Sequence, residues 1–593
     1  MAALFTTPRR NDTTAGTHVA EPDVRRRIGL AHGSWRRVTR RIVAGAVCAL
    51  TVSSLLMPSV SLAAEWVKVG GNKYNTAASD EAGTWSWDGA DDLKLNNYNG
   101  GEIQAAGKLN VNYSGTNIVT AEWIESIKVS HGTNENAELN IQGDEGGTLS
   151  VTSAEDAILS TGNINIDGAG SANATSTGFD AINAGGDLAI KGSGNVNATG
   201  ASDGIRANGN ITIDDSGAVT ARATKDKGIG ADKNLTIKGG GTVEASSADG
   251  EALWSGGNIN ISDGSQVKAS SEKDAAVEAK GSLAVTNASL DASGVEYGVY
   301  AYKGVTLDHA TVMVRTSANG GQAIALITDG DDIVIKNGST VDAFAEGEVS
   351  AAFSTRNDRP NEKGGHIYIS DSVVKAIARY VENGDGPIPY SENQDGETRR
   401  EPQGENIGII AQTSEGVTPA VISIIRSKVT AEGDTAAIFA RAMSADGKTI
   451  GTIKIENAAI QTPEGGKVID YRKLRDGIYE AGQAIGTGDA TVDSLYIKAV
   501  AKSTTIAPPE VAKPEDPKPD ETKPAESKPA ESKQNPKPEG SKPTKAVAAS
   551  TTKAKTTGVL AATGDTSGAA IVATVLAGTA AIAAGTMASR KRS

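Results

Sequence analysis

Six aspartates recur at steps of 23 to 25 residues through the middle of the sequence, and their carboxylates could bind metal ions. They are Asp156, Asp180, Asp203, Asp226, Asp249 and Asp274. If equivalent residues stack in neighbouring units, the carboxylates lie ~5 Å apart, and backbone N–H donors, protonation or bound cations must relieve their repulsion. Ca²⁺ takes six to eight oxygens, so the set is a candidate calcium column. The alternative is that each Asp caps its own turn.

A second set of residues at similar spacing is expected to face outward. Its members are Asn183, Arg206, Gly230, Trp254, Glu278 and Tyr300. Trp254 and Tyr300 would lie two units apart, roughly 10 Å, which suits a platform on which sugar rings stack. Arg206, Trp254 and Tyr300 are therefore candidate carbohydrate-binding residues, and ordinary surface aromatics are the alternative.

Groups for catalysis are few. Beyond residue 64 the only histidines are His131, His309 and His366, which are widely separated, and the single Cys48 precedes that point. There is no Gly-rich phosphate loop before a helix, so Ser/His/Asp or metalloprotease chemistry has no support. We assign no catalytic residue, and enzymatic activity stays an open question.

The element that must position these residues is a repeat. Eight pairs of apolar residues, I-x-I in form, recur at steps of 22 to 28 residues: Ile164/Ile166, Leu188/Ile190, Ile211/Ile213, Leu235/Ile237, Ile259/Ile261, Leu283/Val285, Val305/Leu307 and Ile333/Ile335. Apolar residues alternate with period two in short runs, separated by Gly, Asn, Asp and Ser, which indicates strands and turns. Three short strands per unit bury a face only if units stack, so the repeat predicts an all-β, right-handed parallel β-helix of about 24 residues per coil.

The pattern continues on both sides of this block. Further pairs are Leu139/Ile141, Ile367/Ile369, Ile422/Ile424, Ile453/Ile455 and Leu495/Ile497. Thirteen coils at ~4.8 Å each predict a rod on the order of 60 Å. Residues 355–365 and 382–405 interrupt the repeat and are expected to be loops on one edge. Polar residues precede successive pairs and predict a hydrogen-bonded ladder along the axis: Asn163, Asp187, Asn210, Asn234 and Asn258.

Composition and charge limit the function. Aromatic residues make up only 4% of the 593 residues, which suits a narrow core of Ile, Val, Leu and Ala. The chain carries −14 overall, with +6 on residues 1–64 and +2 on residues 564–593, so the part between carries −22. So acidic a surface disfavours direct binding to nucleic acid or to an anionic membrane. An acidic polysaccharide would need a bridging cation such as Ca²⁺.

The sequence divides into five segments. Residues 1–64 combine an Arg-rich start, an apolar run and a small-residue exit, and predict a secretory signal peptide. Residues 65–138 hold four of the six Trp and are expected to cap the rod, with sugar stacking as the alternative. Residues 139–500 form the β-helix. Residues 501–559, rich in Pro, Lys and Glu, predict an extended, disordered spacer. Residues 560–593 contain an apolar span and a basic tail, which predict a membrane helix.

The last segment resembles the cell-wall sorting signal of Gram-positive surface proteins. Its motif is Leu560, Ala561, Ala562, Thr563 and Gly564. In that family a sortase thiolate attacks the carbonyl of the Thr, here Thr563, and transfers the chain to a peptidoglycan amine. Ala561 stands where Pro is usual, a variant read by another sortase class. The resemblance implies sortase and peptidoglycan as partners and a cell-wall-anchored protein on the bacterial surface, with the membrane contacted only by the C-terminal span before sorting.

The repeat itself resembles bacterial carbohydrate-binding β-helix proteins related in fold to pectate lyases. The resemblance rests on D-G-I-x-A at residues 203–207 and G-N-I-x-I at residues 209–213. It implies extracellular polysaccharide, acidic and bridged by Ca²⁺, as the partner. A polysaccharide lyase would use a basic residue such as Arg206 or Arg222 as its base. Three hypotheses follow: a polysaccharide-binding or adhesive rod, a lyase, and a structural stalk or adhesin for host proteins.

Overall fold

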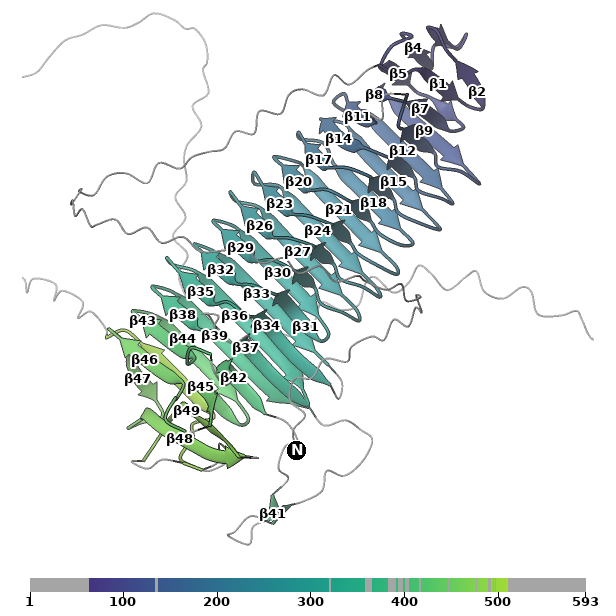
Figure 1. Ribbon diagram of the computed structural model, residues 1–593. Coiled ribbons are helices and arrows are strands. Elements are labelled where there is room, and N and C mark those ends of the chain that lie inside the picture. The colour runs from purple at the N-terminus through teal and green to yellow at the C-terminus, as the bar shows by residue number, and fades with distance from the viewer. Residues whose placement is uncertain are drawn as a thin grey trace, which may run out of the picture. The chain divides into compact units, whose positions relative to one another are not determined.

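The chain folds into stacked coils of three strands each (Figure 1). The computed structural model describes residues 63–509, except for 134–136, 319–320, 358–364, 382–390, 393–397, 400–404, 415–416, 446, 476, 489–491, 494 and 496–497. The described residues contain no helix long and apolar enough to cross a membrane. The expected signal peptide up to residue 62, most of the spacer, and the sorting segment lie outside the described residues.

Sheet A carries the I-x-I pairs. In spatial order its strands are β3 (Ala78–Ser79), β4 (Trp85–Trp87), β5 (Asp92–Asn96), β8 (Lys108–Ser114), β11 (Glu138–Gly143), β14 (Asn163–Gly168), β17 (Leu188–Lys191), β20 (Ile211–Asp214), β23 (Leu235–Lys238), β26 (Ile259–Ser262), β29 (Leu283–Thr286), β32 (Val305–Asp308), β35 (Ile333–Lys336), β38 (Ile367–Ser370), β43 (Val421–Ile425) and β46 (Thr452–Glu456). From β5 onward all neighbours are parallel.

Sheet C follows sheet A within each coil. Its strands are β6 (Asn99–Gly100), β9 (Thr116–Ala121), β12 (Thr148–Ser153), β15 (Ser171–Ser176), β18 (Val196–Gly200), β21 (Ala218–Ala223), β24 (Thr242–Ser247), β27 (Gln266–Ser271), β30 (Ser289–Gly294), β33 (Thr311–Ser317), β36 (Thr340–Gly347), β39 (Val373–Tyr380), β44 (Lys428–Gly433), β50 (Ser503–Ala507) and β47 (Ala459–Thr462). The last two strands run antiparallel.

Sheet B completes the coil. Its strands are β2 (Asn72–Tyr74), β1 (Trp66–Val69), β7 (Ile103–Ala106), β10 (Ile127–Ser130), β13 (Ile158–Ser160), β16 (Ile182–Ala184), β19 (Ile205–Ala207), β22 (Ile229–Ala231), β25 (Leu253–Ser255), β28 (Val277–Ala279), β31 (Tyr297–Ala301), β34 (Gln322–Asp329), β37 (Val349–Asn357), β42 (Asn406–Thr413), β45 (Ala436–Ser444), β49 (Ile478–Gly486) and β48 (Lys467–Arg475). A separate antiparallel pair, β40 (Ser391–Glu392) and β41 (Thr398–Arg399), lies in the second expected insertion.

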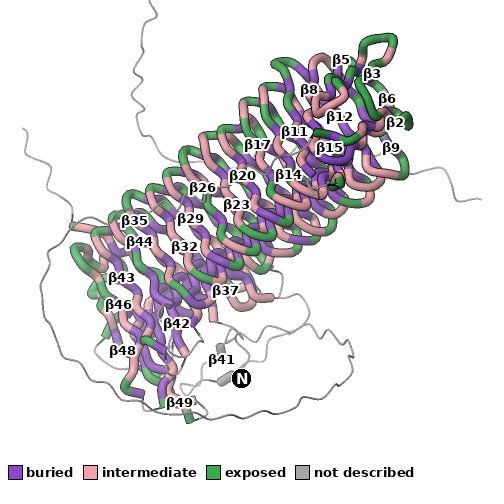
Figure 2. Tube along the Cα trace, turned by 45° about the horizontal axis from the view of Figure 1, so that its top comes forward, coloured by how far each residue is buried: buried purple, intermediate pink, exposed green. Residues whose placement is uncertain are grey.

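The register confirms a parallel β-helix. Ile164 lies opposite Leu188, Leu188 opposite Ile211, and so on through every pair of the eight-fold block. Alternate residues of each strand therefore point into one continuous core, and the buried positions recur from coil to coil in Figure 2. Fully burying one Ile or Leu contributes about 1.5–3 kcal/mol. Each added coil buries the same set of inward positions, so the stability of the stack grows by a similar amount from coil to coil.

The corner between sheets A and C explains why Asn, Asp and Gly recur there. The left-handed residue lies two positions after the second inward residue of a sheet A strand. Its φ is 58° at Asp263, 49° at Asn287 and 56° at Asn337. Gly has no Cβ to hinder this conformation, and Asn and Asp tolerate it better than other residues. The corner residues are therefore set by backbone geometry and carry no information about a ligand.

The coils widen toward the C-terminal end. Strands of sheet B have three residues in β13 to β28 but eight or nine in β34, β37, β42 and β45. The longer strands are nearly continuous apolar runs that are buried on both faces, as expected for a covered parallel sheet. Their outward residues, such as Ile407 and Ile410, pack with Ile469 and Tyr471 in a second apolar cluster.

Both ends of the rod are capped by antiparallel strands, and both expected boundaries shift. Parallel coils begin at Asp92, before the expected residue 139, because β5 already pairs in parallel with β8, and β8 with β11. Trp85 and Trp87 are 7% and 2% exposed and close the N-terminal end, as predicted, whereas Trp123 is 83% exposed outside the cap. Stacking on a sugar therefore stays an alternative only for an exposed ring such as that of Trp123.

At the other end, β50 pairs with β44 and β47, so the fold extends past the expected limit at residue 500. Leu495 lies in a turn and packs in the second apolar cluster rather than in sheet A. The predicted strand position at Leu495 is therefore wrong, and Ile497 lies outside the described residues. The last parallel strand of sheet A is β46 in the described residues, because antiparallel strands end the stack there.

Candidate functional site on sheet B

The outward column predicted from the repeat forms on sheet B. Its members lie directly opposite one another in successive strands: Asn183, Arg206, Gly230, Trp254, Glu278 and Tyr300. The residues on either side of each member point into the core, so the column faces outward. Trp254 and Tyr300 are half-buried, and Glu278 lies between them in the strand that separates their two coils.

The predicted aspartate column is wrong beyond its first three members. Asp156, Asp180 and Asp203 each lie two residues before the first inward residue of a sheet B strand, and they align. The Oδ1 atoms of Asp156 and Asp180 each accept the N–H of the next aspartate at 2.9 Å, and Oδ1 of Asp203 accepts the N–H of Lys227 at 2.6 Å. Lys227 and then Glu251 occupy the next positions.

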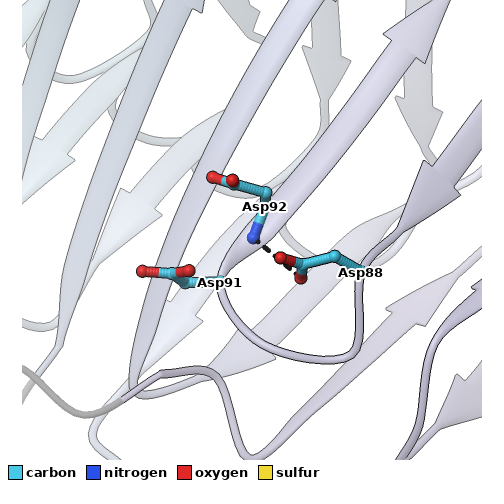
Figure 3. Close-up of side chains that lie close together, drawn as sticks. All are labelled: Asp88, Asp91 and Asp92. Carbon is cyan, nitrogen blue, oxygen red and sulfur yellow. Dashed lines mark hydrogen bonds between the residues drawn. The ribbon is translucent and has the colours of Figure 1, made fainter.

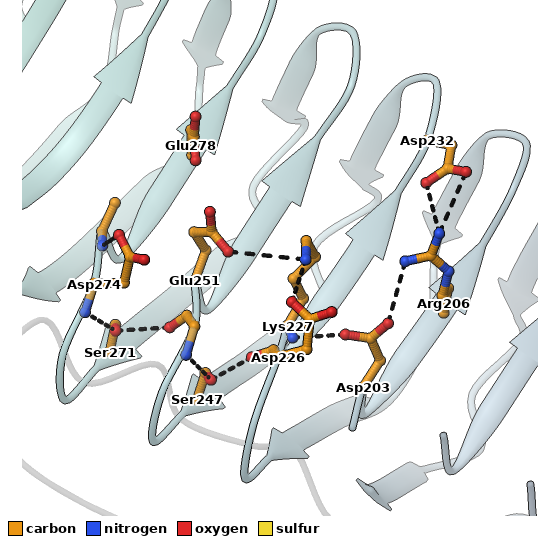
Figure 4. Close-up of polar contacts among 12 residues, drawn as sticks. Asp203, Arg206, Asp226, Lys227, Asp232, Ser247, Glu251, Ser271, Asp274 and Glu278 are labelled. Atoms are coloured by element: carbon orange, nitrogen blue, oxygen red, sulfur yellow. Dashed lines mark hydrogen bonds and ion pairs between the residues drawn. The ribbon is translucent and has the colours of Figure 1, made fainter. Parts of the chain in front are cut away.

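The cause is the position of the aspartate within the turn before sheet B. Asp203 lies two positions before the strand's first inward residue, whereas Asp226, Asp249 and Asp274 lie three, four and three positions before theirs. Asp226 therefore contacts Lys227, and Oδ1 of Asp274 accepts the N–H of the next residue at 2.7 Å (Figure 4). Asp249 contacts Lys273.

The six aspartates do not fit a calcium column. Ca²⁺ needs six to eight oxygens around one point, and one oxygen of each aligned aspartate already accepts a backbone N–H. Among the described residues, the only three acidic side chains with mutually close oxygens are Asp88, Asp91 and Asp92 (Figure 3). Asp88 Oδ1 accepts the N–H groups of Ala90 and Asp92 at 2.8 and 3.2 Å, so this cluster is a turn. Ca²⁺ therefore enters the binding test below only as a condition, added or left out.

Arg206 is held between two carboxylates. Its guanidinium lies 3.4 Å from Asp203 Oδ2 and 3.1 Å from Asp232 Oδ1. Burial opposes the charge, but Asp232 and Asp203 raise the pKa of Arg206 above its usual range. A lyase base must lose its proton, so the geometry gives no support to Arg206 in that role. Arg222 lies on sheet C and pairs with Glu244 at 3.7 Å, away from sheet B.

A chain of polar contacts continues across the next coils. Lys227 Nζ lies 4.0 Å from Glu251 Oε2 and 5.3 Å from the centroid of the Trp254 ring. Burial, followed by the hydrogen bond to Glu278, raises the pKa of Glu251 well above its ordinary value. Lys280 in turn contacts Glu278. Carboxyl and ammonium groups thus lie in contact beside Trp254, in the order Lys227, Glu251, Glu278 and Lys280, and Figure 4 shows the first part of this row.

Aromatic rings follow in the next coil. Tyr300 stacks on Tyr302 at 4.5 Å with an interplanar angle of 16°, and Tyr297 lies 4.9 Å from Tyr300. Lys280 donates to the Tyr302 hydroxyl at 2.9 Å, and the Tyr300 hydroxyl donates to Asp329 Oδ2 at 3.4 Å. These rings offer flat apolar surface with hydrogen-bonding groups at their edges.

Together these side chains define the sheet B face. Its members are Arg206, Lys227, Glu251, Trp254, Glu278, Lys280, Tyr300 and Tyr302. Sequence reasoning placed Arg206, Trp254, Glu278 and Tyr300 in the outward column and missed Lys227, Glu251, Lys280 and Tyr302. Counting two positions back from each inward residue of sheet B, rather than from one Asp to the next, would have found Lys227 and Glu251. The sorting motif at residues 560–564 lies outside the described residues.

Apolar ring faces beside carboxyl and ammonium groups can pack against the C–H face of a sugar and hydrogen-bond its hydroxyls. None of the eight members of the sheet B face is a Ser, Thr or Cys that a neighbouring base could activate. The arrangement therefore suits binding better than covalent catalysis. Comparison of the chain with family models, with curated proteins and with solved structures found no match.

Proposed function

We propose that the chain is a surface-anchored rod whose sheet B face binds polysaccharide. The observation that carries the proposal is the alternation of ring faces and hydrogen-bonding groups along one column. Trp254 and Tyr300 lie two coils apart, which is roughly 10 Å, with Glu278 between them. An extended polysaccharide lying along the axis would meet a stacking surface at alternate coils and polar groups between them.

The pairing of charges favours a neutral polysaccharide over an acidic one. Arg206, Lys227 and Lys280 each contact at least one carboxylate of the rod. A uronate polymer would have to break these ion pairs or bring its own cations, whereas neutral hydroxyl groups can join the existing hydrogen bonds. Acidic chains bridged by Ca²⁺, as the resemblance implies, stay the alternative ligand.

The test is a glycan array probed with the full chain, with neutral and acidic polysaccharides and with and without Ca²⁺. Trp254→Asn is the matched variant, because Asn183 occupies the same column three coils earlier. We expect at least one polysaccharide to bind and the variant to bind it about tenfold more weakly, since a stacked ring contributes about 1 kcal/mol or more. Unchanged binding in the variant would contradict the sheet B face.

An array that shows no glycan binding would favour the adhesin for host proteins. The lyase hypothesis predicts an unsaturated product that absorbs ultraviolet light when the chain acts on polygalacturonate with Ca²⁺. No contact in the described residues favours that outcome, so we do not propose it as the function.

The display part of the proposal rests on the sequence. The motif at residues 560–564, the apolar span and the basic tail support covalent attachment to peptidoglycan by a sortase. Residues 508–559 would then extend from the wall to hold the rod away from it. We also propose that the coil is right-handed and that the C-terminal apolar span forms a membrane helix.

A further inference from the structure

A hollow of about 420 Å³ lies on the outward side of sheet A, away from the sheet B face. Strands β32, β35 and β38, with the turns that precede them, supply its lining: Thr306, Asp331, Asp332, Val334, His366 and Tyr368. Thr306, Val334 and Tyr368 are successive members of one outward column. The outward side of sheet A carries another hollow, of about 560 Å³, over β17 to β26, and its lining contains no aromatic ring or histidine. His366 and Tyr368 therefore distinguish the hollow at β38.

His366 is fixed in one tautomer by the ladder that precedes the I-x-I pairs. In that ladder a side-chain acceptor takes the N–H of the equivalent residue in the next coil, as Asn234 does from Asn258 at 2.9 Å. His366 donates its own N–H to Asp332 Oδ1 at 3.0 Å, and its Nδ1 accepts the N–H of Val421 at 3.1 Å. Because Nδ1 is an acceptor, the ring proton lies on Nε2.

This Nε2–H group has no hydrogen-bond partner within the described part of the chain. The His366 side chain lines the hollow, where water reaches this donor. A ligand oxygen in the hollow can replace that water as the acceptor of the Nε2–H. The same tautomer excludes His366 as a metal ligand, since neither nitrogen keeps a free lone pair.

Tyr368 supplies an apolar surface beside this donor. It is 37% exposed, and its ring meets the His366 ring edge-on at a centroid distance of 5.8 Å. The equivalent position in other coils holds a Thr, as at Thr212, Thr236 and Thr306, so the fold itself does not need an aromatic ring. Asp331 and Asp332, which directly precede β35, add carboxylate acceptors to the lining.

We propose that this hollow binds one neutral pyranose unit, independently of the sheet B face. The apolar face of the sugar packs on Tyr368, its hydroxyl groups donate to the two aspartates, and one of its oxygens accepts the Nε2–H of His366. The two carboxylates disfavour a uronate, because no basic side chain lines the hollow. The inference concerns a different sheet, so it does not depend on the proposed function.

The repeat supplies matched variants for the test. His366→Asn keeps the ladder, since Asn is the acceptor at this position in other coils, but removes the Nε2–H. Tyr368→Thr restores the residue found at three equivalent positions. Asp249→Asn, which is outside both the hollow and the sheet B face, is the control. Trp254→Asn reports any binding at the sheet B face. The measurement is saturation-transfer NMR and titration of the full chain with methyl glycosides of glucose, galactose and mannose, and with glucuronate.

We expect a neutral glycoside to bind, both sheet A variants to bind it at least about tenfold more weakly, and Asp249→Asn to bind it unchanged. Thermal melting of His366→Asn and Tyr368→Thr checks that they fold. The proposal is overturned if no neutral glycoside binds, if glucuronate binds more tightly, or if both folded variants bind like the unaltered chain. Loss of binding in Trp254→Asn would assign the signal to sheet B and would equally overturn it.

Discussion

Polar side chains at the coil corners mainly satisfy backbone N–H groups of the next coil. Asn163 and Asn258 do so before sheet A, and Asp156 and Asp180 do so before sheet B. Each such bond contributes about 0.5–1.5 kcal/mol, and it also fixes the register of adjacent coils. At the residue scale, recurrence of a polar side chain is therefore explained by the backbone it caps, and a ligand must be argued from groups that the ladder leaves unused.

Asp156 shows what this capping costs. Burial raises its pKa to about 6, above the unfolded value of about 3.9, although the Asp180 N–H opposes the shift. The folded state therefore binds the proton more tightly, so stability falls as the pH rises from about 4 to 6 and is lowest above that range. Asp156→Asn keeps an oxygen for the Asp180 N–H and removes the charge. We expect the variant to be more stable at pH 7.5, by on the order of 1 kcal/mol after solvent screening.

Urea unfolding at pH 4 and pH 7.5 measures this difference. The gain should disappear at pH 4, where the unaltered carboxyl is protonated in the folded chain. Asp249→Asn is the control, because Asp249 is exposed and paired with Lys273. A gain of equal size at both pH values would show that the effect does not come from the buried charge.

At the scale of the element, the repeat predicts the strands and their inward and outward residues. It does not predict the position of a residue within a turn or the strands that lack the repeat. The I-x-I pairs and the outward column were predictable because each strand has period two and each inward residue has a counterpart one coil away. The aspartate column failed because Asp226, Asp249 and Asp274 lie three or four positions, rather than two, before the first inward residue of sheet B. The C-terminal antiparallel strands were not predictable, since β49 and β50 lack the repeat.

Strand β50 allows a test of the C-terminal boundary of the fold. Thr504 and Ile506 are fully buried in it, and it covers the free edge of β44. A chain ending at residue 502 loses this strand, whereas one ending at residue 509 keeps it. We expect the shorter chain to lose about 2 kcal/mol or more from Ile506 alone and to self-associate through the exposed edge. The urea midpoint and size-exclusion profile measure both effects, and identical behaviour of the two chains would contradict the assigned boundary.

At the scale of the whole molecule, the rod separates its candidate sites by sheet. The sheet B face lies on β19 to β31, and the sheet A hollow lies on β32, β35 and β38, so the two are on different sheets of successive coils. Two sites on separate sheets of one stack can hold two chains of a polymer, or one branched chain, without any change in the fold.

Attachment is testable through the sorting motif. If a sortase cleaves after Thr563, the chain becomes covalently linked to peptidoglycan and is released only when a muramidase digests the wall. Thr563→Ala removes the side chain at the attacked residue, so we expect the variant to stay in the membrane fraction through its apolar span, residues 569–589. Expression in a Gram-positive host with a sortase, followed by wall and membrane fractionation, measures the distribution. Thr556→Ala, seven residues upstream, is the control and should stay wall-linked. Wall linkage of Thr563→Ala equal to that of the control would refute sorting at this motif and leave the rod without its proposed anchor.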